Sequence, residues 1–271
     1  MKIACIQPKL LESREKCYRK IEDIIKQLLS ECGKCEIICL PERWVPLNND
    51  IPSNFQEERG DDYKFVKNLA ERYSINLISG AIWEKRKNSS KPIITCYYFN
   101  DEGEEIGRQN KIHLYTYERQ FFMPGEELKI FKFRNYQFAI LICFDMAFYE
   151  TPRLAVENGV DILFSPTQIK KAGIDNWKIY LKARALENRI PVVACNTCGK
   201  IRDITFPGNS QLVSFSGGPL TPSRLKIKQG PYEKHGFVYD DLDLEFPKKL
   251  RNHRLKEKVE KDQIRVKFIE G

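Results

Sequence analysis

Glu42, Lys111 and Cys143 each lie within two residues of the end of a segment that is predicted to be a strand. The three segments are residues 36–40, 105–109 and 138–142. Polar side chains at strand ends open onto the edge of a sheet, where α/β proteins build their sites. Taken alone, each residue has an ordinary explanation as a loop glutamate, a surface charge or a buried structural cysteine. Together they supply the carboxylate, the ammonium group and the thiol that a cysteine nucleophile uses in catalysis.

The elements that must position these residues alternate between strands and helices. Helices are expected at residues 12–32, 61–73, 151–158 and 176–189. Short apolar or alternating runs predict strands at residues 2–7, 36–40, 76–83, 93–100, 105–109, 138–142, 161–165, 192–196, 211–215 and 236–242. The alternation favours an α/β fold, and a hairpin around the turn at 101–104 indicates a mixed sheet. No linker divides the chain, so we expect one domain.

Length and composition fit one globular unit. The chain has 271 residues, of which 42% are apolar and 30% are charged, and this balance allows a sizeable core. No window approaches the roughly 18 consecutive apolar residues of a transmembrane helix. Residues 1–8 read as a strand and not as a secretory signal. Because nine cysteines are scattered over the chain, we expect reduced thiols and a cytoplasmic protein.

The net charge of +8 raises the question of a nucleic-acid partner. Most of the excess lies between residues 248 and 267, which hold nine lysines or arginines and three acids. Such a run is usually a solvated segment, and it lacks the interleaved aromatic residues of a single-strand binder. We therefore expect residues 246–271 to form a basic C-terminal tail without a nucleic-acid partner. A patch for another acidic partner is the alternative.

Two pairs of cysteines have the spacing of metal ligands. They are Cys32 with Cys35, and Cys195 with Cys198. The pairs lie so far apart in the sequence that a zinc site with four cysteines would need them to meet in the fold. A disulfide within either pair is an alternative, and ordinary packing of the four side chains is the interpretation we favour.

From its first strand to about residue 245, the chain resembles the nitrilase superfamily of carbon–nitrogen hydrolases. Members carry a glutamate in a Leu-Pro-Glu segment, a lysine in a Lys-x-His-Leu segment and a cysteine in a Cys-x-Asp segment. These match Glu42, Lys111 and Cys143, and the family's second glutamate matches Glu118. Further matching segments lie at residues 122–125, 153–155, 159–163, 184–188 and 208–210. The resemblance identifies residues 1–245 as a carbon–nitrogen hydrolase domain.

This resemblance implies a four-layer α-β-β-α sandwich in which two mixed sheets lie face to face. Family members commonly pair through the helices that follow the catalytic cysteine, here residues 149–158 and 176–189. Apolar side chains on these helices support a homodimer or a larger even-numbered assembly. They are Leu154, Val156, Trp177, Tyr180 and Leu181. The resemblance also implies that no cofactor and no membrane contact are needed.

The implied reaction is hydrolysis of a small carboxamide through a thioester on Cys143. The pKa of a free cysteine is about 8.5, so this thiol needs a base at neutral pH. Glu42 would take the thiol proton, give it to the leaving amine and then activate water. Lys111 and the backbone N–H of Phe144 would stabilise the oxyanion. Glu118 would position Lys111 or the substrate nitrogen.

The sequence departs from the family pattern at Ala147 and Tyr149, where arginine and proline are common. These departures affect substrate choice and subunit packing more than the chemistry. Within the family, an N-carbamoyl amine or amino-acid hydrolase and a nitrilase are the alternatives; an acyltransferase or a glutaminase is a further option. A function of another class is non-catalytic binding of an acidic partner by the basic tail. Lys170, Lys171 and Arg189 are candidates for contact with a substrate carboxylate.

Overall fold

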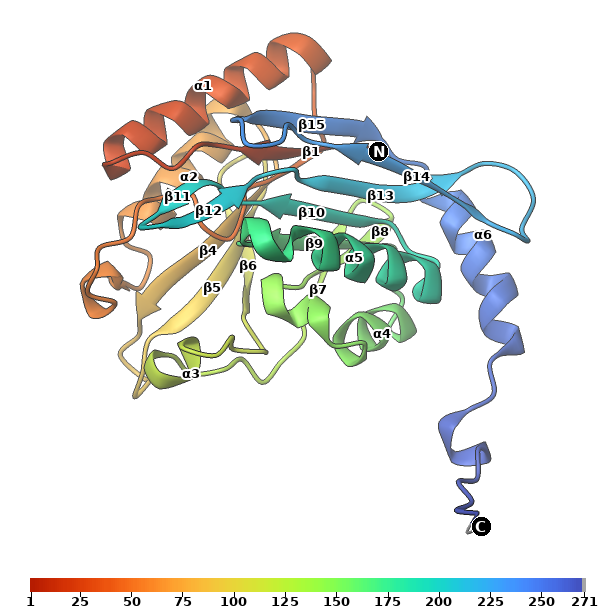
Figure 1. Ribbon diagram of the computed structural model, residues 1–271. Helices are drawn as coiled ribbons and strands as arrows, with labels where there is room; N and C mark the ends of the chain where they lie inside the picture. Colours follow the sequence, from red (N-terminus) through yellow and green to blue (C-terminus); the bar gives the residue numbers. More distant parts are fainter. Residues whose placement is uncertain (270–271) are drawn as a thin grey trace.

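Two β-sheets lie face to face in the computed structural model, which describes residues 1–269 (Figure 1). The first sheet has the strand order β15-β1-β2-β4-β5-β6, and β3 pairs with β4. Its strands are β1 (Lys2–Gln7), β2 (Ile37–Cys39), β3 (Gln56–Glu57), β4 (Leu77–Lys85), β5 (Ile93–Phe99), β6 (Glu105–Asn110) and β15 (Gly236–Asp241). The pairs β1–β2 and β2–β4 are parallel, whereas β4–β5 and β5–β6 are antiparallel. The sheet is therefore mixed.

The second sheet has the strand order β14-β13-β10-β9-β8-β7. Its strands are β7 (Ile130–Phe133), β8 (Tyr136–Ile140), β9 (Ile162–Thr167), β10 (Val192–Asn196), β13 (Gln211–Ser216) and β14 (Arg224–Gln229). The central pairs β8–β9 and β9–β10 are parallel, and the outer pairs are antiparallel. A separate hairpin is formed by β11 (Cys198–Ile201) and β12 (Ile204–Pro207).

Helices cover the outer face of each sheet, so apolar side chains are buried at three levels. Trp83, Phe138 and Phe164 belong to the core between the sheets. A second core lies beneath α1 (Arg14–Cys32) and α2 (Asp61–Tyr73) on the first sheet. A third lies beneath α4 (Glu150–Glu157), α5 (Ile174–Asn188) and α6 (Glu245–Arg254) on the second sheet. This arrangement confirms the predicted four-layer α-β-β-α sandwich.

Local chemistry explains where the longest helix begins and ends. The side chain of Ser13 accepts a hydrogen bond from the backbone N–H of Lys16 at the start of α1, which satisfies one of the unpaired donors of the first turn. Gly33 follows the last residue with φ of 69°, a conformation that glycine adopts without strain. The apolar side chains of α1 recur at helical spacing and are buried against the first sheet.

Several elements were not predicted from the sequence. Strands β7, β11, β12 and β14 and helix α6 belong to this group. In α6, Leu250 and Arg251 are buried, and the guanidinium of Arg251 lies 3.4 Å from the carboxylate of Asp161. The basic segment is therefore not wholly solvated, because its first turns pack on the second sheet; residues 256–269 are exposed. Among the described residues, no helix has the length and apolar character needed to cross a bilayer.

The apolar residues that are exposed on α4 and α5 differ from those that the sequence assigned to an assembly surface. Val156, Trp177 and Leu181 are buried inside the subunit, where they support the second sheet. Leu154 and Tyr180 remain exposed, and other large apolar side chains on or beside α4 and α5 join them. The additional residues are Tyr149, Ile179 and Leu186. An exposed apolar surface of this kind is typical of a subunit interface.

We expect the protein to form a homodimer or a larger even-numbered assembly through α4 and α5. Light scattering at micromolar concentration should give at least twice the subunit mass of 31.8 kDa. Leu154→Glu should lower the measured mass because it places a charge on the apolar surface. Ile106→Glu is the matched control, since Ile106 is equally exposed but belongs to β6 of the first sheet and not to α4 or α5. A wild-type protein that is monomeric throughout this range would contradict the prediction.

Candidate functional site

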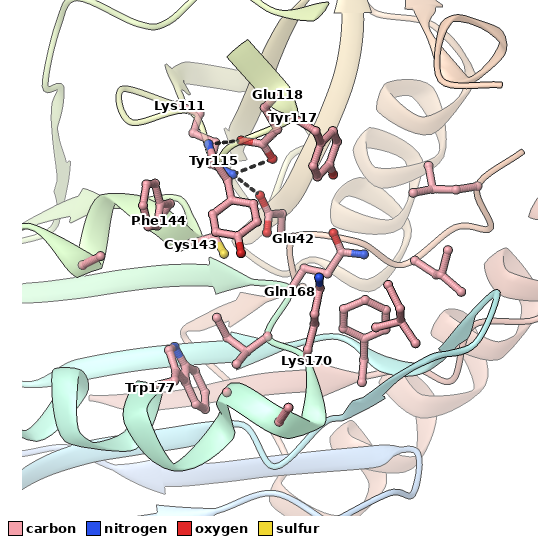
Figure 2. A pocket seen from close by; sticks show the side chains of 18 of the residues that line it. Glu42, Lys111, Tyr115, Tyr117, Glu118, Cys143, Phe144, Gln168, Lys170 and Trp177 are labelled. Carbon is pink, nitrogen blue, oxygen red and sulfur yellow. Dashed lines mark hydrogen bonds and ion pairs between the residues drawn. The ribbon is translucent and has the colours of Figure 1, made fainter. Parts of the chain in front are cut away.

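A cavity of about 760 Å³ reaches from the molecular surface to Glu42, Lys111, Glu118 and Cys143. Glu42, Lys111 and Glu118 are almost fully buried at its inner end. Figure 2 shows the sulfur of Cys143 beside the carboxylate of Glu42, with Lys111 and Glu118 next to them. The three residues that the sequence singled out at strand ends therefore meet at one place, and Glu118 lies with them.

Lys111 holds the centre of this arrangement. Its ammonium nitrogen lies 2.7 Å from Glu42 Oε1 and 2.9 Å from Glu118 Oε1. We call these three residues the charged cluster. An ammonium group has three N–H donors, and two of them are used by the carboxylates. The third remains for a group inside the cavity.

Glu42 is fixed by backbone contacts to both sheets. It follows β2, and its N–H donates to the carbonyl of Thr167 at the end of β9 over 3.3 Å. Its carbonyl accepts the N–H of Ala81 in β4 over 3.2 Å. Gly80 has φ of 69°, and a Cβ atom there would lie only 2.1 Å from the carbonyl oxygen of Pro41. Glycine is therefore required for the Pro41–Glu42 segment to pass so close to β4.

Lys111 follows β6 and is held on both sides of its peptide unit. Its N–H donates to the carbonyl of Ile94 over 2.9 Å, and its carbonyl accepts the N–H of Gly125 over 2.7 Å. A Cβ atom on Gly125 would lie 2.8 Å from the carbonyl oxygen of Asn110. The lack of a side chain at Gly125 thus allows the loop after α3 (Glu118–Phe121) to pack against the lysine segment.

Cys143 is the first residue of the short 3-10 helix η2 (Cys143–Ala147) and lies in the sharp turn that follows β8. Its φ of 48° lies in the left-handed region, which costs energy for a residue with a side chain. The buried carboxylate of Asp145 stabilises the turn, since its Oδ2 accepts the N–H of Ile142 over 2.9 Å. Its Oδ1 accepts the N–H of His113 over 2.7 Å. Asp145 therefore joins the cysteine turn to the segment that carries Lys111.

This joining function of Asp145 was not inferred from the sequence, which placed the residue only within a Cys-x-Asp segment. A carboxylate two residues after a candidate nucleophile could have indicated it, because such a side chain can accept backbone N–H groups of its own turn. Arg184 adds support from α5, donating to the carbonyls of Met146 and Ala147. The matching segment at residues 184–188 thus acts through the backbone of the cysteine turn.

The second glutamate and the predicted oxyanion donor are also placed at the site. Glu118 begins α3, and its Oε2 accepts the N–H of Tyr115 over 2.7 Å. This contact aims its other oxygen at Lys111. The N–H of Phe144 lies in the first turn of η2, where a 3-10 helix leaves N–H groups without partners inside the helix. The ring of Phe144 packs edge-on against Tyr115.

Burial and charge determine the protonation states at the site. Burial lowers the pKa of Lys111, but Glu42 and Glu118 outweigh it and hold the pKa well above that of an ordinary lysine. Burial raises the pKa of Glu118. Burial and the charge of Glu42 also raise the pKa of the Cys143 thiol well above its usual value, although Lys111 opposes the shift. At neutral pH the site thus holds an ammonium ion and a neutral thiol.

The outer part of the cavity is mainly aromatic and aliphatic. Its walls include Tyr115, Tyr117, Phe144, Trp177 and Phe206. None of these was predicted as a site residue except Phe144, because an aromatic residue in a sequence is usually part of a core. Gln168 follows β9 and also lines the cavity.

Of the three cations proposed to meet a substrate carboxylate, Lys170 alone is among the described lining residues. Figure 2 shows its side chain extending into the cavity. Lys171 pairs instead with Glu233, and Arg189 donates to Ser223. Arg202, in the turn between β11 and β12, lines the cavity and donates to Asn49. Arg202 could not be inferred from the sequence, since the hairpin that carries it was not predicted.

The two cysteine pairs do not meet. Cys32 and Cys35 lie at the end of α1 and before β2. Cys195 belongs to β10 and donates to the carbonyls of Ile6 and Cys39. All nine cysteines are free thiols, and within residues 1–269 no group of His, Cys, Asp and Glu side chains is arranged to hold a metal ion.

Known proteins resemble this chain over nearly its whole length. A family model described as carbon–nitrogen hydrolase matches residues 2–245. A probable nitrilase of Schizosaccharomyces pombe is 29% identical over 258 residues, which are 93% of this chain and 92% of that protein. The 2-oxoglutaramate amidase of Bacillus subtilis is 28% identical over 244 residues, which are 86% of this chain and 90% of that protein.

The fold has counterparts among solved structures. The crystal structure of a nitrilase-superfamily member from Saccharomyces cerevisiae aligns with a TM-score of 0.82 and 22% sequence identity, and the alignment covers 95% of each chain. The two proteins therefore share the four-layer fold. Together with the family match, these similarities show that the chain belongs to the carbon–nitrogen hydrolase family and is a hydrolase of the amidase type.

Proposed function

We propose that this protein hydrolyses the C–N bond of a carboxamide through a thioester on Cys143. The observation that carries the proposal is the charged cluster at the inner end of the cavity, with Cys143 beside it. Such a cluster sets a proton acceptor and a cation next to a thiol, which are the groups that acyl transfer to sulfur requires.

In the first half of the reaction, Glu42 accepts the thiol proton as the sulfur attacks the amide carbon. A base is needed at this step because the pKa of the Cys143 thiol is raised by burial. The carbonyl oxygen gains negative charge, which the free N–H of Lys111 and the N–H of Phe144 stabilise. Glu42 then returns the proton to the nitrogen, and the amine leaves.

In the second half, water attacks the thioester. Glu42 accepts a proton from that water, and the same two donors stabilise the second oxyanion. The carboxylic acid is released, and the proton returns to the Cys143 sulfur. Glu118 keeps Lys111 in place throughout, because its two oxygens link the ammonium group to the N–H of Tyr115.

The charge of the outer cavity supports the proposal of an acidic substrate. The carboxylates among the described lining residues are Glu42 and Glu118, and both are paired with Lys111. Lys170 and Arg202 add positive charge near the entrance without a carboxylate partner in the cavity. We therefore propose an amide that carries a carboxylate at the end opposite its C–N bond. The similarity to a 2-oxoglutaramate amidase supports this choice.

Replacement of Cys143 tests the proposed function directly. We expect Cys143→Ala and Cys143→Ser to keep the fold and to lose ammonia release from every substrate in a panel of amides, N-carbamoyl compounds and nitriles. Serine fails because its hydroxyl is too weakly acidic to serve as the nucleophile here. With a slow amide, mass spectrometry of the wild type should show an acyl group on Cys143. An acyl group on another cysteine would contradict the assignment.

Glu42→Gln tests the proposed base. Glutamine keeps the shape but can neither accept nor donate the proton, so acylation should fall by two to four orders of magnitude, as is typical for a lost general base. Because the pKa of the Cys143 thiol is raised, the residual rate should increase about tenfold per pH unit as the thiolate fraction grows. Rapid-quench measurement of the acyl-enzyme gives both values. A wild-type rate of acylation in this variant would show that the general base is another residue, with Glu118 the first candidate.

Lys170→Met tests the acidic substrate. The variant should lose about tenfold in kcat/KM for amides that carry a carboxylate, which corresponds to roughly 1.4 kcal/mol. Neutral amides of the same length should be unaffected. Lys171→Met is the matched control, because Lys171 is paired with Glu233 outside the cavity. Equal losses for charged and neutral amides would show that Lys170 does not select for the carboxylate.

A further inference from the structure

Cys32 and Cys35 bring two thiols into contact far from the cavity. Cys32 is the last residue of α1, and Cys35 lies two residues before β2. Their sulfur atoms are 3.2 Å apart. Neither belongs to the described lining of the cavity, so the amidase chemistry gives this pair no role.

The two thiols differ in their access to solvent. Cys32 is partly exposed, whereas Cys35 is fully buried in the core beneath α1. The turn between them is formed by Gly33, whose φ of 69° brings the chain back toward β2. This arrangement gives the pair an outer thiol that reagents can reach and an inner thiol that faces it.

The chain contains a natural comparison with the same spacing. Cys195 and Cys198 are also separated by two residues, but Cys195 belongs to β10 and Cys198 begins β11. The Cys195 sulfur donates to the carbonyls of Ile6 and Cys39 over 3.1 and 3.2 Å. Both cysteines are buried. Spacing alone therefore does not bring thiols together in this protein; the turn after α1 does.

We propose that Cys32 and Cys35 are a reversible redox site that forms an intramolecular disulfide at the expense of a low-molecular-weight disulfide such as oxidised glutathione. The Cys32 thiolate attacks one glutathione sulfur, the S–S bond breaks, and one glutathione thiolate leaves and takes up a proton. The Cys35 thiolate then attacks the Cys32 sulfur and releases the second glutathione. The protein loses two hydrogens, and one glutathione disulfide becomes two glutathione molecules.

The position of the pair determines how it behaves. It lies at the C-terminal end of a 19-residue helix, where the helix dipole disfavours negative charge. Burial and the contact with Cys32 raise the pKa of Cys35. Cys35 thus lacks thiolate stabilisation of the kind that makes a disulfide oxidising. Exchange should therefore be slow at neutral pH.

The test uses the full-length Cys143→Ala protein, which removes the cavity thiol from the measurement. The protein is equilibrated with mixtures of reduced and oxidised glutathione, quenched with acid, unfolded, alkylated and digested for mass spectrometry. We expect the peptide with Cys32 and Cys35 to lose two hydrogens and both alkylation sites in a single transition. Cys195 and Cys198 should remain fully alkylated over the same range. Independent alkylation of Cys32 and Cys35 in every mixture would overturn the proposal.

Single replacements separate the two thiols. Cys35→Ser should accumulate glutathione on Cys32, because the inner thiol that displaces it is gone. Cys32→Ser should accumulate none on Cys35, which is buried. Glutathione on Cys35 in that variant, or a wild-type Cys32 that stays glutathionylated instead of forming the disulfide, would contradict the assigned order.

Stability and activity provide independent readouts in protein with Cys143 intact. Oxidation should raise Tm by a few degrees in the wild type, because a disulfide restricts the unfolded chain, and should leave Tm unchanged in Cys32→Ser. Amide hydrolysis by Cys32→Ser should equal that of the wild type, since Cys32 lies outside the cavity. An oxidised wild type without any rise in Tm relative to Cys32→Ser would count against the disulfide.

Discussion

A buried ammonium ion between two carboxylates is the constraint on which the site depends. Removing Lys111, Glu42 and Glu118 from water is costly, and the cost is recovered only if their geometry is maintained. Each member therefore needs its own backbone support. Thr167 and Ala81 hold Glu42, Ile94 and Gly125 hold Lys111, and Tyr115 holds the Glu118 carboxylate. Loss of Lys111 would leave both carboxylates buried without a partner, so the lysine holds the cluster together.

The sandwich brings together side chains of the proposed site that neither sheet carries alone. Glu42 and Lys111 follow strands of the first sheet, whereas Cys143 follows β8 of the second. The proposed base and nucleophile thus meet only when the two sheets pack. Asp145 strengthens this connection, because its carboxylate binds the backbone of both the cysteine turn and the lysine segment. The proposed hydrolytic site therefore forms at the interface between the sheets.

Much of this arrangement could be predicted from the sequence. Helix α2 and strand β10 have the predicted bounds, since periodic or uniformly apolar segments between clear breaks leave little ambiguity. Strand β14 and helix α6 were not predicted because charged residues dominate both segments. The few apolar residues that pack against the core, such as Leu250, therefore do not form a clear pattern. Trp177 was assigned to a subunit interface, yet it supports the second sheet and lines the cavity. The sequence shows that a side chain is apolar, but only the tertiary structure decides whether it packs in the core or at a subunit interface.

The hydrogen bond from the N–H of Glu42 to the carbonyl of Thr167 spans the gap between the sheets. The width of that gap is set by the large side chains that fill it, among them Trp83 and Phe164. Because protein cores are close-packed and resist compression, this filling acts as a spacer between the two halves of the site. The volume of these core side chains therefore contributes to the spacing of the two sheets that carry the Glu42 carboxylate and the Cys143 sulfur.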